Sequence, residues 1–205
     1  MDLVIATHNP GKFREIAEIL GDLPIRLLPL ASIPRVSLPA EDGWSLEENA
    51  LKKAQVVAES TGKWALADDS GLEIEALGGG PGLLSARFLG EEADPHLRNQ
   101  RILELLADIP LEGRGAQFRC VIAIAEPGGR TYIAEGACGG FIATASKGEG
   151  GFGYDPIFLV PEYSQTMAEL DPAIKNRVSH RAKALLQARK ILEALLEPPH
   201  DSSGA

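Results

Sequence analysis

Hydrophobic and polar positions in the first third of the chain predict strands that alternate with helices. The apolar run at residues 3–6 predicts a strand, and residues 7–11 read as a loop. Helical spacing then appears in the apolar residues Phe13, Ile16, Ile19 and Leu20. A second helix is expected to start at Ser45, because Ser45 and Glu48 form an S-x-x-E capping box ahead of an apolar stripe.

The middle of the chain predicts strands and the last part ends in a long helix. Residues 64–67 read as a buried strand that ends at 68–71, and residues 72–76 alternate as a half-buried strand. A helix over 95–107 is followed by two paired strands at 116–125 and 131–138. The segment 154–160 reads as extended, and a final helix runs over 179–196.

These elements predict the fold class α/β, with one elongated mixed β-sheet flanked by helices. Strands alternate with helices at first, and an antiparallel pair follows. Neither an internal repeat nor a linker divides the chain, so residues 1–197 are expected to form a single domain. Residues 198–205, which follow the helix and begin with two prolines, are expected to form a flexible tail.

Composition excludes several functional classes. Of 205 residues, 44% are hydrophobic, which is typical of a folded globular protein. A net charge of −9 argues against non-specific binding of nucleic acid or anionic membranes. No apolar run has the roughly 18 residues of a membrane span. Two cysteines, Cys120 and Cys138, match neither a zinc ribbon nor a disulfide-rich fold, so a cytoplasmic location is expected.

Charge is distributed unevenly along the chain. Residues 41–75 contain a surplus of acids and residues 171–190 a surplus of bases. This asymmetry suggests a metal-binding side and an anion-binding side, although two ordinary solvated faces would give the same pattern.

A candidate phosphate site follows the first predicted strand. Backbone N–H groups at a helix start carry partial positive charge, and a lysine in the first turn adds a full charge. The residues concerned are Thr7, His8, Asn9, Pro10, Gly11 and Lys12. The sequence is not a Walker A loop, and a plain strand-to-helix turn remains the alternative.

Acidic residues offer a candidate magnesium site. Mg²⁺ prefers carboxylate and phosphate oxygens and keeps several waters, so one or two carboxylates from Glu41, Asp42, Asp68 and Asp69 suffice. Adjacent residues of a strand point to opposite faces. Only one of Asp68 and Asp69 is therefore expected to face the site, while the other braces a loop or a helix start. An Asx turn is the alternative interpretation.

Two further segments suggest a pocket for a flat base. Residues 148–156 contain G-x-G-x-x-G, but the extended segment that follows argues against a dinucleotide-binding fingerprint. Phe152 and Tyr154 next to Asp155 offer stacking and edge recognition, or else simply fill the core. His180 and Arg181 at a helix start oppose the helix dipole unless an electronegative group lies opposite.

Six motifs in order closely resemble the inosine triphosphate pyrophosphatase family, which hydrolyses non-standard purine nucleoside triphosphates. The resemblance spans residues 3–196. It rests on T-H-N-x-x-K-x-x-E at 7–15, E-N-A-x-x-K-A at 48–54, A-D-D-S-G-L at 67–72, P-G-x-x-S-A-R-F at 81–88, G-G-F-G-Y-D-P at 150–156 and S-H-R at 179–181.

The resemblance implies a two-lobed α/β fold with the active site in the cleft, a homodimer, Mg²⁺ as cofactor, and a purine nucleoside triphosphate as substrate. The substrates ITP, dITP and XTP would be cleaved at the α–β phosphoanhydride to the monophosphate and pyrophosphate. Glu41 and Asp69 would bind Mg²⁺, and Asp69 would also act on the attacking water. Residues 7–12 and Lys53 would hold the phosphates.

By the same resemblance, Ser70 would contact the substrate and a second group would form the base pocket. That group consists of Phe152, Gly153, Tyr154, Asp155, Lys175, His180 and Arg181. Donors there would favour the O6 acceptor of hypoxanthine over the amino group of adenine. Guanine also carries O6, so its rejection is not explained. A Maf-like pyrophosphatase for other modified nucleotides and a non-catalytic nucleotide-binding regulator are the alternatives.

Overall fold

The computed structural model describes residues 1–197, and the predicted tail at 198–205 lies outside the described residues. Eight strands form one mixed sheet: β1 (Asp2–Ile5), β2 (Arg26–Pro29), β3 (Trp64–Ile74), β4 (Pro81–Gly82), β5 (Gly115–Ala125), β6 (Thr131–Ile142), β7 (Phe158–Val160) and β8 (Gln165–Thr166). The helices are α1 (Pro10–Leu20), α2 (Leu46–Thr61), α3 (Pro95–Leu105), α4 (Pro172–Val178) and α5 (His180–Leu196).

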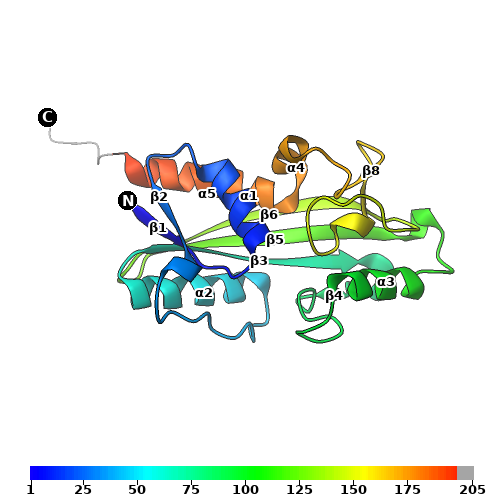
Figure 1. The fold of residues 1–205 in the computed structure, drawn as a ribbon, viewed down its shortest axis with the longest axis horizontal. Coiled ribbons are helices and arrows are strands. Elements are labelled where there is room, and N and C mark those ends of the chain that lie inside the picture. The colour runs from blue at the N-terminus through cyan, green and yellow to red at the C-terminus, as the bar shows by residue number, and fades with distance from the viewer. Residues whose placement is uncertain (198–205) are drawn as a thin grey trace, which may run out of the picture.

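The molecule is elongated along three long strands (Figure 1). The sheet order is β2-β1-β3-β5-β6-β7-β8, with β4 paired to β3. β1 is parallel to both β2 and β3, whereas β3, β5 and β6 are antiparallel. The predicted fold class, an elongated mixed sheet flanked by helices, is therefore confirmed.

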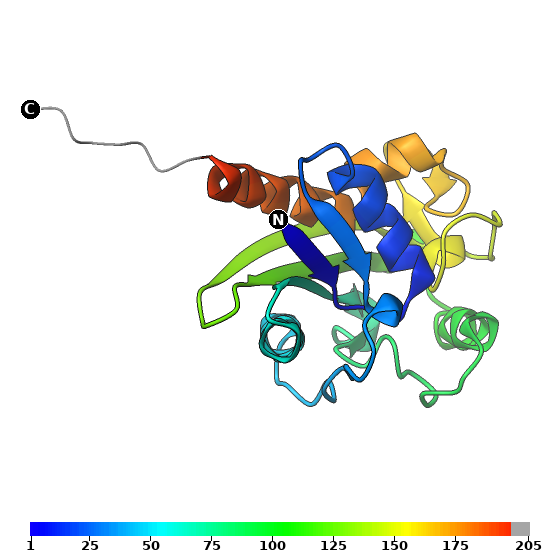
Figure 2. The ribbon, with the colours of Figure 1, turned by 60° about the vertical axis from the view of Figure 1, so that its left-hand side comes forward.

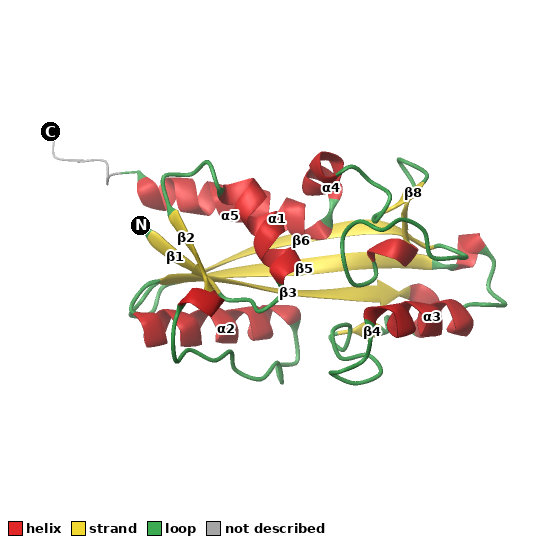
Figure 3. Cartoon of the chain, viewed as in Figure 1, coloured by secondary structure: helices red, strands yellow, loops and turns green. Residues whose placement is uncertain are grey.

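Helices cover both faces of the sheet (Figures 1 and 2). At the end that carries β1 and β2, α1 and α5 pack on one face through Ile16, Leu185 and Leu192. α2 packs on the other face, where Ala50, Ala54 and Val57 meet small residues of the strands. A third core lies at the opposite end, among α3, β7 and the far halves of the long strands. The cores thus divide the molecule into two lobes that share β3, β5 and β6 (Figure 3).

Most predicted elements are confirmed, but two segments differ. Residues 155–157, predicted to be extended, form a short 3-10 helix ahead of β7, and the second difference affects the site. Ser45 caps α2 by accepting a hydrogen bond from the Glu48 amide (3.0 Å), and Glu48 Oε2 accepts from the Trp44 amide (2.8 Å). The prediction that a strand ends at residues 68–71 is wrong, because β3 continues through them to Ile74. β5 pairs with β3 along the whole of that segment, and this backbone ladder overrides the turn preference of Asp-Ser-Gly.

The elements that sequence analysis missed are short. They are β2, β4, β8 and α4, which has seven residues. Within residues 1–197, no helix combines the length and apolar character that crossing a membrane requires.

Candidate functional site

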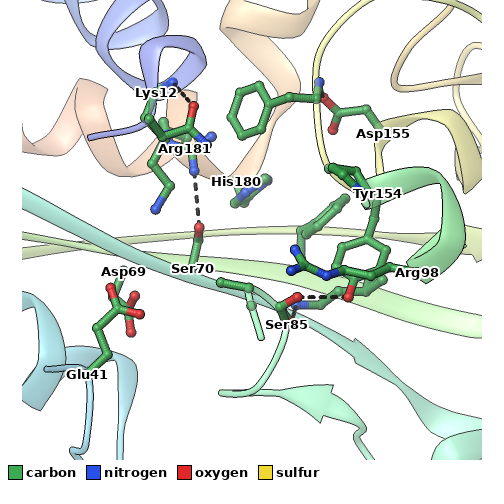
Figure 4. Close-up of a pocket in the computed structure, with 18 residues that line it drawn as sticks. Lys12, Glu41, Asp69, Ser70, Ser85, Arg98, Tyr154, Asp155, His180 and Arg181 are labelled. Atoms are coloured by element: carbon green, nitrogen blue, oxygen red, sulfur yellow. Dashed lines mark hydrogen bonds between the residues drawn. The ribbon is translucent and has the colours of Figure 1, made fainter. Parts of the chain in front are cut away.

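A pocket opens where the edge of β3 loses its neighbouring strands. β1 pairs with β3 only as far as Leu66, and β4 pairs with it at Leu72 and Glu73. Between these points, Asp69 and Ser70 line a pocket that lies between the two lobes (Figure 4). The lining residues that the sequence predicted are Asn9, Lys12, Glu41, Asp69, Ser70, Phe152, Gly153, Tyr154, Asp155, His180 and Arg181.

Alternation along β3 sends the two aspartates to opposite faces. Ala65 and Ala67 belong to the core under α2, whereas Leu66 belongs to the core under α1 and α5. By the two-residue period of a strand, Asp68 faces α1 and α5, and Asp69 faces α2. The prediction that only one of the two lines the site agrees with the pocket, which Asp69 lines and Asp68 does not.

Asp68 joins the starts of two helices. Its Oδ2 lies 3.0 Å from Lys12 Nζ in the first turn of α1, and it accepts from Arg181 Nε (3.1 Å) and Nη2 (3.0 Å) at the start of α5. Burial alone would raise the pKa of Asp68, but Lys12, Arg181 and Lys53 lower it well below its usual value. Asp68 is therefore an anion at neutral pH and holds two cations of the pocket in place.

Two carboxylates of the protein, Asp68 and Glu15, stabilise the positive charge of Arg181 at the start of α5. Besides Asp68, the Arg181 guanidinium donates to Glu15 Oε2 (2.8 Å) and Ser70 Oγ (3.1 Å). These anions offset the unfavourable dipole interaction that the sequence analysis noted. One base of residues 171–190, Arg181, pairs with one acid of residues 41–75, Asp68, so the two charged segments meet at the site and are not two separate solvated faces.

Lys53 lies between the two acidic residues predicted to bind metal. Its Nζ contacts Glu41 Oε1 (2.5 Å), Asp69 Oδ1 (3.1 Å) and the Asp68 carbonyl (2.7 Å), which accounts for all three of its protons. Asn49 Nδ2 donates to Asp69 Oδ2 (3.1 Å). Lys53 is buried and is absent from the pocket lining, so it supports the carboxylates from behind.

Burial raises the pKa of Asp69 above its usual value, and the negative charge of Glu41 acts in the same direction. Lys53 and Asn49 oppose this rise without cancelling it. Among residues 1–197, no cluster of three or more His, Cys, Asp or Glu side chains is arranged to hold a metal ion. Two neighbouring carboxylates nevertheless suit Mg²⁺, which takes its remaining ligands from phosphates and water and would relieve the repulsion between Glu41 and Asp69.

The glycine-rich segment is fixed by a buried ion pair. Asp155 Oδ2 accepts from the Phe152 amide (2.8 Å) and from Lys175 Nζ (2.6 Å), and Lys175 Nζ also lies 2.7 Å from Glu15 Oε1. Lys175 does not line the pocket. The Phe152 ring centroid lies 5.0 Å from Lys175 Nζ and 5.3 Å from Arg181 Cζ, so the ring covers both cations.

His180 is a neutral group in the pocket wall. It is buried and stacks on Phe118, with 4.5 Å between ring centroids. Burial, together with the positive charges of Arg181 and Lys175, lowers its pKa well below 6.5. Its buried Nδ1 has no hydrogen-bond partner within the described chain.

The loop before α1 satisfies its own amides. Asn9 Oδ1 accepts from the amides of Gly11 (2.8 Å) and Lys12 (3.2 Å), and Thr7 Oγ1 accepts from the Asn9 amide (3.1 Å). Thr7, His8, Pro10 and Gly11 do not line the pocket. Gly11 instead lies against the Phe152 ring, where an added Cβ would come within 2.5 Å of Cδ1. Of residues 7–12, Asn9 and Lys12 line the cavity.

Some of the pocket lining had no role predicted from the sequence. These residues are Gly71, Leu72, Ser85, Ala86, Pro95, Arg98 and Phe118. Ser85 and Ala86 belong to a motif that carried no assigned role, and its link to the site is the hydrogen bond from Tyr154 Oη to the Ser85 carbonyl (2.8 Å; Figure 4). The sequence offered no signal that Arg98 or Phe118 belongs to the site, because Arg98 lies in an ordinary polar helix and Phe118 lies in a strand.

Comparison with known proteins agrees with this architecture. Residues 3–191 match the model of the Ham1 family. A dITP/XTP pyrophosphatase of Desulforamulus reducens is 53% identical over 95% of this chain and 97% of its own, and one of Bacillus subtilis is 47% identical over 94% and 98%. The structure of a HAM1 protein from Coxiella burnetii is similar with a TM-score of 0.86 and 42% identity, covering 95% of this chain and 99% of that one. The chain belongs to the Ham1 family, as the order of its motifs predicted.

Proposed function

We propose that the protein hydrolyses non-standard purine nucleoside triphosphates, namely ITP, dITP and XTP, to the nucleoside monophosphate and pyrophosphate. The observation that carries the proposal is one pocket that combines an aromatic ring, cationic side chains and paired carboxylates, in a chain 53% identical to a dITP/XTP pyrophosphatase. A Maf-like pyrophosphatase is not favoured, because the curated relatives over nearly the full length carry the dITP/XTP name.

The phosphates are proposed to lie at the end of the pocket that carries Lys12, Glu41 and Asp69. Lys12 is partly exposed there, with 17% of its side chain accessible, so it has a free face for a phosphate oxygen. Lys53 has no free proton in this arrangement, so it would contact a phosphate only by releasing one of its present partners. Asn9 keeps the α1 start in the conformation that presents Lys12.

Glu41 and Asp69 are proposed to hold Mg²⁺. When bound, the ion supplies charge neutralisation on the phosphate oxygens and orients the leaving pyrophosphate. Asp69 is proposed to orient or deprotonate the attacking water, since its carboxylate lines the pocket at the end proposed for the phosphates. Asn49 and Lys53 fix the plane of that carboxylate through one contact to each of its oxygens.

The purine is proposed to lie against Phe152, with His180 and Arg181 near O6. Neutral His180 can donate from its outward nitrogen, and Arg181 retains one Nη1 proton beyond those given to Asp68, Glu15 and Ser70. Adenine would bring an amino donor against these donors, at a cost of about 1–3 kcal/mol for each unpaired group. Lys175 acts indirectly, by holding Asp155 and the Phe152 segment.

A homodimer in the cytoplasm is the proposed form of the enzyme. The dimer is what the family resemblance implies, and two free, buried cysteines suit a reducing compartment. Light scattering on the purified chain tests the dimer by its mass.

The central experiment measures pyrophosphate release from ITP, XTP, ATP and GTP, with and without Mg²⁺. Metal-dependent turnover of ITP and XTP well above that of ATP and GTP is expected. Equal turnover of all four nucleotides would contradict the proposed specificity. Tight binding of ITP without pyrophosphate release would favour the non-catalytic regulator.

A further inference from the structure

Arg98 presents unused hydrogen-bond donors to the pocket. It lies on α3 and lines the pocket at the end remote from Lys12 and Asp69, with its guanidinium directed toward the cavity (Figure 4). Its Nε donates to the Phe88 carbonyl (2.9 Å), and Nη2 donates to the carbonyls of Gly90 (2.9 Å) and Glu91 (3.2 Å). These three bonds clamp one edge of the guanidinium, while Nη1 has no hydrogen-bond partner within residues 1–197.

Neighbouring polar groups at this end are already engaged. Ser85 Oγ donates to the Gly82 carbonyl (2.6 Å) and accepts from the Leu72 amide (2.8 Å). Tyr154 Oη donates to the Ser85 carbonyl (2.8 Å). Of these side chains, Arg98 alone therefore has donors available to a ligand.

The proposed orientation of the nucleotide in the pocket places one edge of its purine ring near Arg98. In a purine nucleotide, positions 1, 2 and 6 lie on the side of the ring farthest from the sugar and the phosphates. With the phosphates at Lys12 and Asp69, that edge points away from this end of the pocket (Figure 4). Arg181 shares Asp68 with Lys12, so O6 lies at the side of the edge nearer Arg181 and His180, and position 2 is the part left for Arg98 on α3.

We propose that Arg98 reads position 2 of the purine ring and thereby separates xanthine from guanine. Xanthine has a carbonyl oxygen at position 2, which accepts from Nη1, whereas guanine has an amino donor there. Hypoxanthine has only C–H at this position, so it loses no hydrogen bond to the cation. Xanthine also ionises more readily than hypoxanthine, and a guanidinium favours the anion.

The inference about Arg98 rests on the proposed function. The experiment distinguishes failure of the inference from failure of the proposed function. Values of kcat/KM for ITP, XTP and GTP are compared between wild type, Arg98→Met and Arg98→Lys. Arg101→Met is the matched control, because Arg101 lies on the same helix but is exposed and pairs with Glu104 (3.3 Å). Absence of ITP and XTP turnover in the wild type would overturn the proposed function itself.

Arg98→Met is expected to lower the XTP-to-ITP ratio of kcat/KM about ten- to hundredfold and to raise the GTP-to-ITP ratio. Arg98→Lys, which keeps the charge, should give an intermediate ratio, and Arg101→Met should leave both ratios unchanged. If Arg98 only braces the loop at 88–91, the values of kcat/KM for all three substrates will fall by the same factor. Unchanged ratios in both Arg98 variants would overturn the inference, whatever the absolute rates; if Arg98→Met does not fold, Arg98→Lys decides by the same criterion.

Discussion

Asp69 and Asp68 are adjacent carboxylates with opposite protonation behaviour, because the strand turns them to different neighbours. Asp69 shares its surroundings with the negative Glu41, whereas Asp68 is surrounded by Lys12 and Arg181. Their sequence context alone gives no means of ranking their pKa values. The directions follow only once the partners on each face of the sheet are known.

Replacing Asp69 by Asn is expected to lower kcat about 10²- to 10⁴-fold, since a neutral amide neither binds Mg²⁺ strongly nor accepts a proton. Pyrophosphate release from ITP measures the effect. Asp42→Asn is the control, because Asp42 is exposed and pairs with Lys52 outside the pocket. Full activity of Asp69→Asn would remove this residue from the proposed mechanism.

In the metal-free protein, the Asp69 carboxyl should take up its proton at a higher pH than an ordinary aspartate, because its pKa is raised by burial and by the charge of Glu41. The carboxyl ¹³C chemical shift of Asp69, followed against pH without Mg²⁺, tests this. A midpoint at the usual aspartate pKa of about 3.9 would contradict it.

Asp68→Asn is expected to destabilise the fold by about 3–5 kcal/mol, because the buried Arg181 and the partly buried Lys12 lose their shared anion. The lowered pKa of Asp68 means that its stabilisation is full above the unfolded-state value and is lost as the pH falls toward the folded-state value. Urea unfolding of both proteins should therefore give a difference that shrinks below about pH 4. A difference that is constant with pH would contradict this assignment.

At the scale of elements, close packing of α5 on β6 sets the position of His180 and Arg181. A Cβ at Gly136 of β6 would lie 2.2 Å from the His180 carbonyl oxygen and 2.4 Å from the Ala184 amide nitrogen. Glycine is thus required for this helix to approach the strand. The start of α5, with its two pocket residues, is held by backbone contact as well as by side chains.

Gly136→Ala is accordingly expected to destabilise the protein by about 1–3 kcal/mol and to lower turnover, because α5 must shift. Gly139→Ala is a matched control on the same strand, since nothing lies within 4 Å of the added Cβ. Thermal unfolding and ITP turnover measure both variants. Equal melting temperatures for the two variants would contradict the packing argument.

Sequence patterns predicted elements better than they predicted contacts between elements. Ser45 and the apolar stripe of α2 are local signals, and the helix forms where they indicate. The continuation of β3 through Asp68 depends on pairing with β5, about fifty residues away, which no local pattern encodes. The same applies to Arg98 and Phe118, whose membership of the site depends on how α3 and β5 pack.

Considered as a whole molecule, the protein buries both cysteines in its central strands. Burial raises the pKa of Cys120 to about 12 and also raises that of Cys138, so neither thiol forms the reactive thiolate readily. A thiol reagent should therefore modify them only as the protein unfolds in urea. Rapid modification of the native protein would contradict this, and Cys138→Ser shows which cysteine reacts.

The three long strands that join the lobes also limit how the molecule moves. β3, β5 and β6 pass without interruption from one lobe to the other and are hydrogen-bonded along their length. A hinge between the lobes would have to break this ladder, so large rigid-body closure is disfavoured. Exchange of nucleotide and pyrophosphate then depends on twisting of the sheet and on the loops at the rim, and these motions become the candidates for the slow step of turnover.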